Sequence, residues 1–254
     1  MTTRPNASPA GAEPAIEVAG LAVAYGAERV LDGIDVAVAA GSITAIVGGS
    51  GCGKSTLLKA VIGLVPAAAG RIAVLGQDQA TLTEPERAAL RQRLGVMFQY
   101  GALLNSLTAA ENVALPLEMH TDLSAAAIRD LARTRLHQVG LDGAEDLLPT
   151  ELSGGMRKRA ALARALAMEP EVLLCDEPGA GLDPVTAAGI DQLLLTLNQS
   201  LGMTTVVVTH ELLSIGRLGG HLVMLEGGRV AFDGPTEAAL ESGELRLRRF
   251  FHPG

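Results

Sequence analysis

The sequence predicts an α/β fold in which a core of buried strands is interrupted by a helical insert. Short apolar runs rich in β-forming residues alternate with helical stretches along most of the chain, which is typical of α/β proteins. The run at 43–47 is almost entirely apolar, as expected for a strand buried on both faces of a sheet. Between about 101 and 168 the strand signals stop, and they resume from 172. We therefore expect one domain whose two halves enclose a helical segment.

The elements follow in this order. Residues 1–14 are rich in proline, alanine and polar residues without a period, which predicts a disordered lead-in to a domain over 15–254. Strands are expected at 16–23, 34–39, 43–47, 71–75 and 94–98, with a helix at 54–64 after the third strand. In the helical insert, 101–168, helices are expected at 123–139 and 154–168. Further strands are expected at 172–175, 204–209, 221–226 and 229–233, so that the core comprises 15–100 and 169–254.

The composition excludes several classes of protein. The 254 residues are 48% hydrophobic and 19% charged, enough for a core that needs no disulfide or metal. The net charge of −8 argues against a nucleic-acid-binding protein that relies on a broad basic surface. The two cysteines have no framework spacing, no apolar run is as long as a membrane span, and no secretory signal is visible. We expect a cytosolic protein with no nucleic-acid partner.

A glycine-rich segment between the strand at 43–47 and the following helix fits the phosphate-binding pattern G-x-x-x-x-G-K-[ST]. Its glycines let backbone N–H groups point into one concavity, to which the helix N-terminus adds positive potential. Lys54 is expected to reach the β- and γ-phosphates of a nucleotide, and Ser55 to ligate Mg²⁺. Cys52 lies at a variable position of this pattern, and we expect it to serve only as a small side chain that fills space. The candidate nucleotide-binding residues are Gly48, Gly49, Ser50, Gly51, Cys52, Gly53, Lys54, Ser55 and Thr56.

An acidic pair, Asp176 and Glu177, ends the apolar run at 172–175. The carboxyl end of a parallel strand lies at the ligand-binding edge of such a sheet. Asp176 would hold Mg²⁺ and Glu177 would polarise the attacking water. Alone the acidic pair is weak evidence for a catalytic site, because strands commonly end in solvated acids. Together with the phosphate loop it becomes strong evidence.

A second anion-binding helix start is predicted at Ser153, Gly154 and Gly155, before an alanine-rich helix. The alternative is a plain helix cap. The same helix carries several basic residues, for which we expect a solvated or phosphate-steering face. These are Arg157, Lys158, Arg159 and Arg164.

Taken together, these motifs resemble the nucleotide-binding subunit of ABC transporters over nearly the whole chain. In order the chain carries Tyr25-Gly26, the phosphate loop, Gln99, the signature Leu152-Ser153-Gly154-Gly155, Asp176 with Glu177, Gly181-Leu182-Asp183, and His210. The resemblance implies an ABC-type nucleotide-binding domain: a RecA-like core, an antiparallel β portion and a helical subdomain. It also implies that two copies sandwich two ATP molecules head to tail, each signature capping the γ-phosphate held by the other copy.

The resemblance assigns roles to the remaining residues. Tyr25 would stack on adenine, although a surface tyrosine at a strand end is the alternative. Gln99 would touch Mg²⁺ and water and sense the helical insert, and by pattern alone it is a loop glutamine. His210 would be a γ-phosphate sensor, although a histidine at a strand end is more often structural. Glu177, His210 and Gln99 are thus the candidate catalytic residues, Asp183 joins the nucleotide site, and Ser55, Gln99 and Asp176 are the candidate metal ligands.

Finer features resemble the ATPase of Mla/Mce-type phospholipid transporters of bacteria. They are Met156 in place of the glutamine of most relatives, YGALLNSLTAAENVALPL after Gln99, and DEPGAGLDP. The resemblance implies a transmembrane permease that docks near Gln99–Leu104, an Mce-type lipid-binding protein, and a position on the cytoplasmic face of the inner membrane. Another solute (amino acid, metal or exported compound) or a soluble non-transport ABC ATPase are the alternatives. Met156 cannot replace the hydrogen bonds of glutamine, and Phe250 with Phe251 is expected to be a packing anchor.

Overall fold

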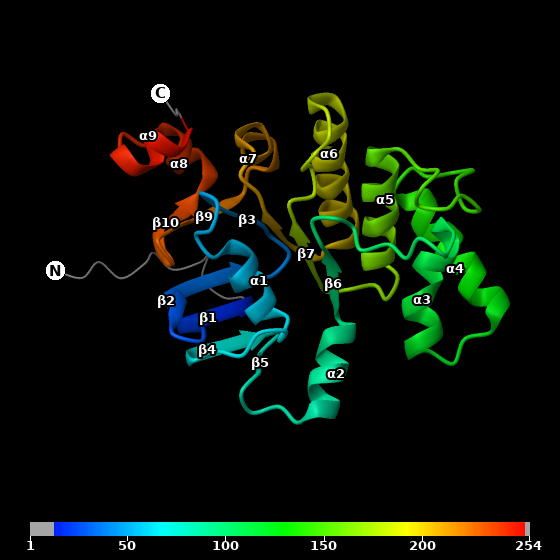
Figure 1. The fold of residues 1–254 in the computed structure, drawn as a ribbon, viewed down its shortest axis with the longest axis horizontal. Coiled ribbons are helices and arrows are strands. Elements are labelled where there is room, and N and C mark those ends of the chain that lie inside the picture. Colours follow the sequence, from blue (N-terminus) through cyan, green and yellow to red (C-terminus); the bar gives the residue numbers. More distant parts are fainter. Residues whose placement is uncertain (1–12, 252–254) are drawn as a thin grey trace.

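A computed structural model describes residues 13–251 as two sheets and the helices around them (Figure 1). The larger sheet has six strands in the order β10-β9-β3-β8-β7-β6, and the smaller has four in the order β2-β1-β4-β5. The strands are β1 (Pro14–Tyr25), β2 (Glu28–Ala39), β3 (Ile43–Gly48), β4 (Ala69–Val74), β5 (Gln77–Asp78), β6 (Leu94–Met97), β7 (Val172–Asp176), β8 (Thr204–Val208), β9 (His221–Glu226) and β10 (Arg229–Pro235). Residues 1–12 of the expected lead-in lie outside the described residues, and β1 begins at Pro14.

The helices follow the expected division of the chain. They are α1 (Lys54–Val61), α2 (Glu84–Gln92), α3 (Ala109–His120), α4 (Ala125–Gln138), α5 (Gly154–Ala165), α6 (Pro184–Leu201), α7 (Leu212–Leu218), α8 (Thr236–Glu241) and α9 (Leu245–Phe251). Helices α3, α4 and α5 stand together at one end of the molecule, in green in Figure 1. No strand lies between β6 and β7 in the described chain, so the predicted end of the strand signals at about 101 is confirmed.

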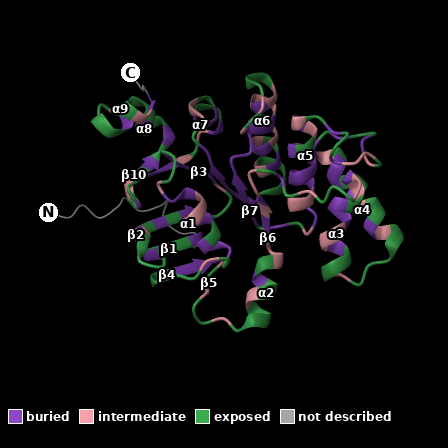
Figure 2. Ribbon diagram, viewed as in Figure 1, coloured by how far each residue is buried: buried purple, intermediate pink, exposed green. Residues whose placement is uncertain are grey.

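The central strands of the larger sheet are buried on both faces, as their apolar residues predict (Figure 2). Every residue of β3, β7 and β8 is buried. Side chains alternate between the two faces with a period of two. Leu174 packs with α1 and the smaller sheet, whereas Leu173 and Cys175 pack with α6 and the helical insert. The β3, β6, β7 and β8 pairings are parallel, and β10 adds an antiparallel edge strand.

This topology sets the position of the functional residues. Because the parallel strands share one direction, the segments that follow β3, β6, β7 and β8 meet at one edge of the sheet. The phosphate loop, Gln99, Asp176 with Glu177, and His210 all follow or end these strands.

The fold departs from the sequence-based prediction at two helices and agrees with it at the end of the described chain. Helices α2 and α3 are absent from the sequence-based prediction, and both begin at a threonine capping box, at Thr83 and Thr108. At the other end of the chain, the rings of Phe250 and Phe251 meet edge to face with centroids 5.2 Å apart. Both pack against the core beneath α7, α8 and α9, which confirms the predicted packing anchor.

Candidate functional site

The loop between β3 and α1 has the geometry of a phosphate-binding turn. Gly48 has φ +147°, and a Cβ atom there would lie 2.3 Å from the carbonyl oxygen of Leu225. Gly53, at φ +105°, is the N-cap of α1, and no side chain caps the first turn of that helix. The first amides of α1 therefore remain available to an anion, and only glycine fits the closest approaches of the loop.

Lys54 lies inside this loop and is 8% exposed. Its Nζ atom donates hydrogen bonds to the carbonyl oxygens of Gly48 (2.8 Å) and Gly49 (3.0 Å). The ammonium group is thus held at the concave side of the loop, where the phosphates of a nucleotide would approach.

Ser55 and Asp176 meet across the top of the sheet. The hydroxyl of Ser55 donates to Oδ1 of Asp176 at 3.3 Å. Burial raises the pKa of the Asp176 carboxyl above its ordinary value, and the Ser55 hydrogen bond partly offsets that rise. A hydroxyl and a buried carboxylate are hard oxygen ligands that suit Mg²⁺ together with phosphate oxygens and water. The residues present therefore fit this ion.

Glu177 and His210, 33 positions apart, form a pair at the same edge. Oε1 of Glu177 lies 2.7 Å from Nδ1 of His210. The second oxygen, Oε2, is buried and has no hydrogen-bond partner. The backbone of Glu177 is in the left-handed region, with φ +51°, a conformation that costs about 1–3 kcal/mol in a residue other than glycine. The hydrogen bond from its N–H to the carbonyl oxygen of Val208 (2.8 Å) helps hold it there. One carboxylate oxygen is therefore held by His210, and the other is buried without a hydrogen-bond partner.

The signature segment starts α5. Ser153 is the N-cap, and its hydroxyl accepts a hydrogen bond from the N–H of Met156 at 3.2 Å. The two glycines lie close to the start of α6: a Cβ atom on Gly154 would lie 3.2 Å from a methyl group of Leu182, just before that helix, and one on Gly155 would lie 2.6 Å from the methyl group of Thr186 in its first turn. Strands β6 and β7 lie between α1 and α5 in Figure 1. The anion-binding start of α5 and the phosphate loop therefore lie on different sides of these strands.

Asp183 caps α6 beside the signature. Its Oδ1 accepts from the N–H groups of Val185 (3.1 Å) and Thr186 (3.0 Å). The hydrogen bond from the Thr186 hydroxyl, followed by these backbone bonds, lowers the pKa of the Asp183 carboxyl. The side chain of Met156 packs partly against the core of the helical insert.

The basic residues of α5 form the expected solvated or phosphate-steering face only in part: Arg157 is exposed, whereas Lys158 is buried and Arg159 and Arg164 are partly buried. Lys158 is buried, and its Nζ atom donates to the carbonyl oxygens of Gln99 (2.5 Å) and Glu177 (3.1 Å). Arg164 donates to those of Gly101 and Ala102, both at 2.8 Å. Arg157 and Arg159 also donate to backbone carbonyl oxygens, of Leu152 and Val139. The prediction is therefore wrong for Lys158, whose ammonium group is buried and supplies a donor to two carbonyl groups.

Sequence reasoning therefore missed Lys158 as a residue of the site. A signal was present: Gly155, Lys158 and Leu162, at helical spacing, share the buried face of α5. A lysine on the buried face of an alanine-rich helix indicates a specific partner.

The loop after Gln99 presents a mixed surface. Tyr100 is 91% exposed and Leu104 is 46% exposed. Gly101 is buried, and Leu103 packs against the core of the helical insert. Tyr25, at the end of β1, is half exposed. The exposed side chains are available for contacts outside the subunit.

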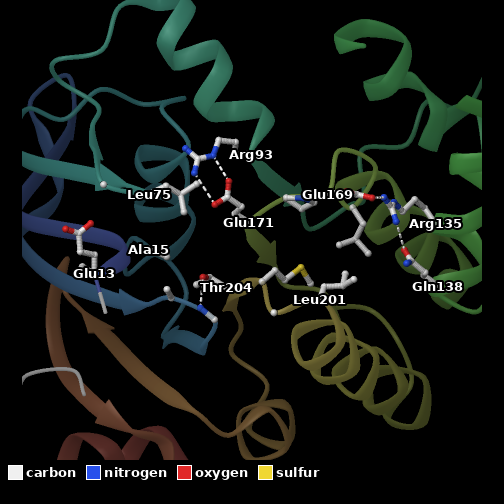
Figure 3. A pocket seen from close by; sticks show the side chains of 18 residues that line it. Glu13, Ala15, Leu75, Arg93, Arg135, Gln138, Glu169, Glu171, Leu201 and Thr204 are labelled. Atoms are coloured by element: carbon white, nitrogen blue, oxygen red, sulfur yellow. Dashed lines mark hydrogen bonds and ion pairs between the residues drawn. The ribbon is translucent and has the colours of Figure 1, made fainter. Parts of the chain in front are cut away.

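A cavity lies at the opposite edge of the sheet (Figure 3). It encloses about 690 Å³ next to the amino ends of β6, β7 and β8. Its two arginines are each paired with a glutamate, Arg93 with Glu171 and Arg135 with Glu169. This cavity is separate from the residues described above.

The matching family model is that of the ABC transporter, which covers residues 31–180. The probable ribonucleotide transport ATP-binding protein mkl of Mycobacterium leprae is 40% identical over 94% of this chain and 69% of its own length. The intermembrane phospholipid transport system ATP-binding protein MlaF of Haemophilus influenzae is 39% identical over 92% of this chain and 89% of its own.

A solved structure gives the same fold. The dimeric post-hydrolysis state of the ATP-binding cassette MJ0796, bound to ADP and phosphate, superposes with a TM-score of 0.80. It is 32% identical and covers 87% of this chain and 98% of its own. Between residues 13 and 251, no helix combines the length and apolar character needed to cross a membrane.

Proposed function

The chain belongs to the ABC transporter family as an ATP-hydrolysing subunit, and on that premise we propose that it powers phospholipid transport between bacterial membranes through a separate permease. The observation that carries the catalytic part is the joint placement of Ser55, Asp176, Glu177 and His210 at one edge of the sheet. The cargo rests on the similarity to MlaF, which extends over nearly the full length of both chains.

In this proposal the loop Gly48–Thr56 and the first turn of α1 hold the phosphates of ATP, with Lys54 beside the β- and γ-phosphates. Ser55, Asp176 and Gln99 hold Mg²⁺. The ion, when bound, neutralises charge that develops on the phosphate oxygens. Tyr25 stacks on the adenine ring from the end of β1.

Glu177 orients the attacking water and accepts its proton. The buried Oε2 atom is the acceptor, since Oε1 is already engaged by His210. His210 fixes the direction of the carboxylate, and its exposed ring edge can reach the γ-phosphate. Phosphoryl transfer needs mainly positioning and charge stabilisation, which these groups supply.

A second copy of the chain completes each site. The segment Ser153–Gly155 offers N–H groups at the start of α5, away from the phosphate loop of its own chain. In a head-to-tail dimer it caps the γ-phosphate held by the other copy, with Asp183 next to it. The dimeric ATP-binding cassette that shares the fold supports this arrangement.

The permease docks on the loop after Gln99, where Tyr100 and Leu104 are exposed. The pair of exposed apolar side chains next to a catalytic loop suits a helix-in-groove contact. Through that contact the subunit sits on the cytoplasmic face of the inner membrane, with an Mce-type lipid-binding protein as a further partner.

The test is to isolate the tagged full chain from detergent-extracted membranes and to identify the proteins and lipids that accompany it. We expect a multi-span permease, a lipid-binding protein and bound phospholipid. A permease with a ribonucleotide, amino-acid or metal-binding protein and no lipid would contradict the cargo and leave the ATPase standing. Recovery of the chain without any multi-span protein would contradict the transport function.

A further inference from the structure

Lys158 connects three functional segments of one chain. It lies in α5, five positions after the signature serine Ser153. Its Nζ atom donates to the carbonyl oxygen of Gln99 at 2.5 Å and to that of Glu177 at 3.1 Å. One buried cation therefore joins the signature helix, the loop that faces the permease in the proposal above, and the residue proposed to activate water.

The surroundings explain how a cation is tolerated there. Burial lowers the pKa of Lys158, and the carboxylates of Glu177, Glu211 and Asp176 oppose that shift. The neighbouring Cys175 is a neutral thiol, because burial raises its pKa to about 12. An ammonium buried at such cost persists where it has specific acceptors, and the two carbonyl oxygens are those acceptors.

The bond to Glu177 falls on a strained part of the backbone. Glu177 has φ +51°, and its own N–H is bonded to Val208. Its carbonyl oxygen accepts from Lys158 and from the N–H of Ala180 (3.2 Å). Lys158 thus supplies the side-chain donor that fixes the peptide following the glutamate, and with it the direction of the carboxylate.

The bond to Gln99 brings in the docking loop. Arg164 of the same helix donates to the carbonyl oxygens of Gly101 and Ala102, which precede the exposed Leu104 in this loop. The loop is therefore attached to α5 at three carbonyl groups, those of Gln99, Gly101 and Ala102, of which only the first shares its donor with Glu177.

We propose that Lys158 is a positioning residue that ties the loop after Gln99 to Glu177, so that movement of this loop on the permease is carried to the carboxylate that orients water. The proposal rests on the ATPase function above. Lys158 itself does not touch the nucleotide; it acts through the two peptide groups that it holds.

The test compares Lys158→Met, Lys158→Gln and Lys158→Arg with the wild type, each as the full chain in complex with its permease. The measurements are ATP affinity, kcat and KM for ATP, and the melting temperature. Arg159→Met is the matched control. It removes a neighbouring cation of the same helix, whose hydrogen bond goes to the carbonyl oxygen of Val139 and not to Gln99 or Glu177.

We expect Lys158→Met to bind ATP about as well as the wild type, while kcat falls roughly 10- to 100-fold, because misplacing a reacting group by about 1 Å costs that much. Lys158→Arg, which keeps the donors, should restore most of kcat, and Arg159→Met should stay within about twofold of the wild type. If the Met variant does not fold, the Gln variant, which keeps a polar head without charge, should show the same selective fall in kcat.

A folded Met or Gln variant with an unchanged kcat would overturn the proposal. So would equal losses of ATP affinity and kcat that follow the melting temperature, because they would mean a purely structural role. A wild-type complex that hydrolyses no ATP would instead overturn the proposed function, and the two failures are therefore distinguishable.

Discussion

Replacing Glu177 by glutamine should stop ATP hydrolysis and leave ATP bound. The amide oxygen can still face Nδ1 of His210, which lies 2.7 Å from Oε1 in the native side chain. The other oxygen, Oε2, makes no hydrogen bond that the substitution would remove. We therefore expect the free energy of unfolding to change by less than about 1 kcal/mol.

The effect on hydrolysis should be much larger. An amide cannot accept the proton of the attacking water, and general-base catalysis contributes about 10²–10⁴-fold to rate. That range corresponds to about 3–5 kcal/mol of transition-state stabilisation. Single-turnover release of phosphate measures the loss, and size-exclusion chromatography with ATP should show a persistent dimer, because the nucleotide that holds it is not consumed.

Glu171→Gln is the matched control. Glu171 directly precedes β7, whereas Glu177 directly follows it, and Glu171 pairs with Arg93 at the edge opposite the nucleotide. Its hydrolysis rate should stay within about twofold of the wild type. If Glu177→Gln hydrolyses ATP as fast as this control, Glu177 is not the general base, and His210 becomes the candidate for that role.

Three further changes probe the rest of the site. Lys54→Ala removes the cation held against Gly48 and Gly49, so nucleotide binding or turnover should fall by at least about tenfold at a near-normal melting temperature, as judged by ATP titration and calorimetry; normal turnover would count against the phosphate loop. Mixing Ser153→Ala chains with Lys54→Ala chains should restore at most one working site per dimer, whereas no recovery over either variant alone would contradict a shared site. Tyr100→Asp with Leu104→Asp should keep ATP binding and abolish capture of the permease in a pull-down, because unpaired charge would be buried at the contact; undiminished capture would place the docking surface elsewhere.

Much of the site follows from local sequence because its chemistry is local. The phosphate loop needs glycine where φ is positive and backbone groups approach closely, and Gly48 and Gly53 meet these requirements. The position of Asp176 follows from the apolar strand before it, since parallel strands present their carboxyl ends at one edge. The sequence resemblance supplied roles for Gln99, His210 and Ser153, which are ordinary residues by pattern alone.

The contacts between distant segments could not be predicted in the same way. The pairing of Glu177 with His210 depends on β7 and β8 being neighbours in register, which no short motif encodes. The partners of Lys158 are carbonyl oxygens, which every residue has, so side-chain identity gives no indication of them. Its place on the buried face of α5 is the only sequence signal.

Helices α2 and α3 were missed for a different reason. Helix α2 is short and buries only Leu90, and α3 contains Pro116. Yet both start with the pattern Thr-x-x-Glu, and in both the threonine and the glutamate form a reciprocal capping box. The starts of both helices could therefore have been predicted from their capping residues.

The central claim is tested most directly by reconstituting the subunit with its permease complex in liposomes that contain a fluorescent phospholipid. ATP with Mg²⁺ should drive movement of the phospholipid at a rate that follows phosphate release, and both should be lost in the Glu177→Gln complex. ATP hydrolysis by the wild-type complex without any movement of phospholipid would contradict the account.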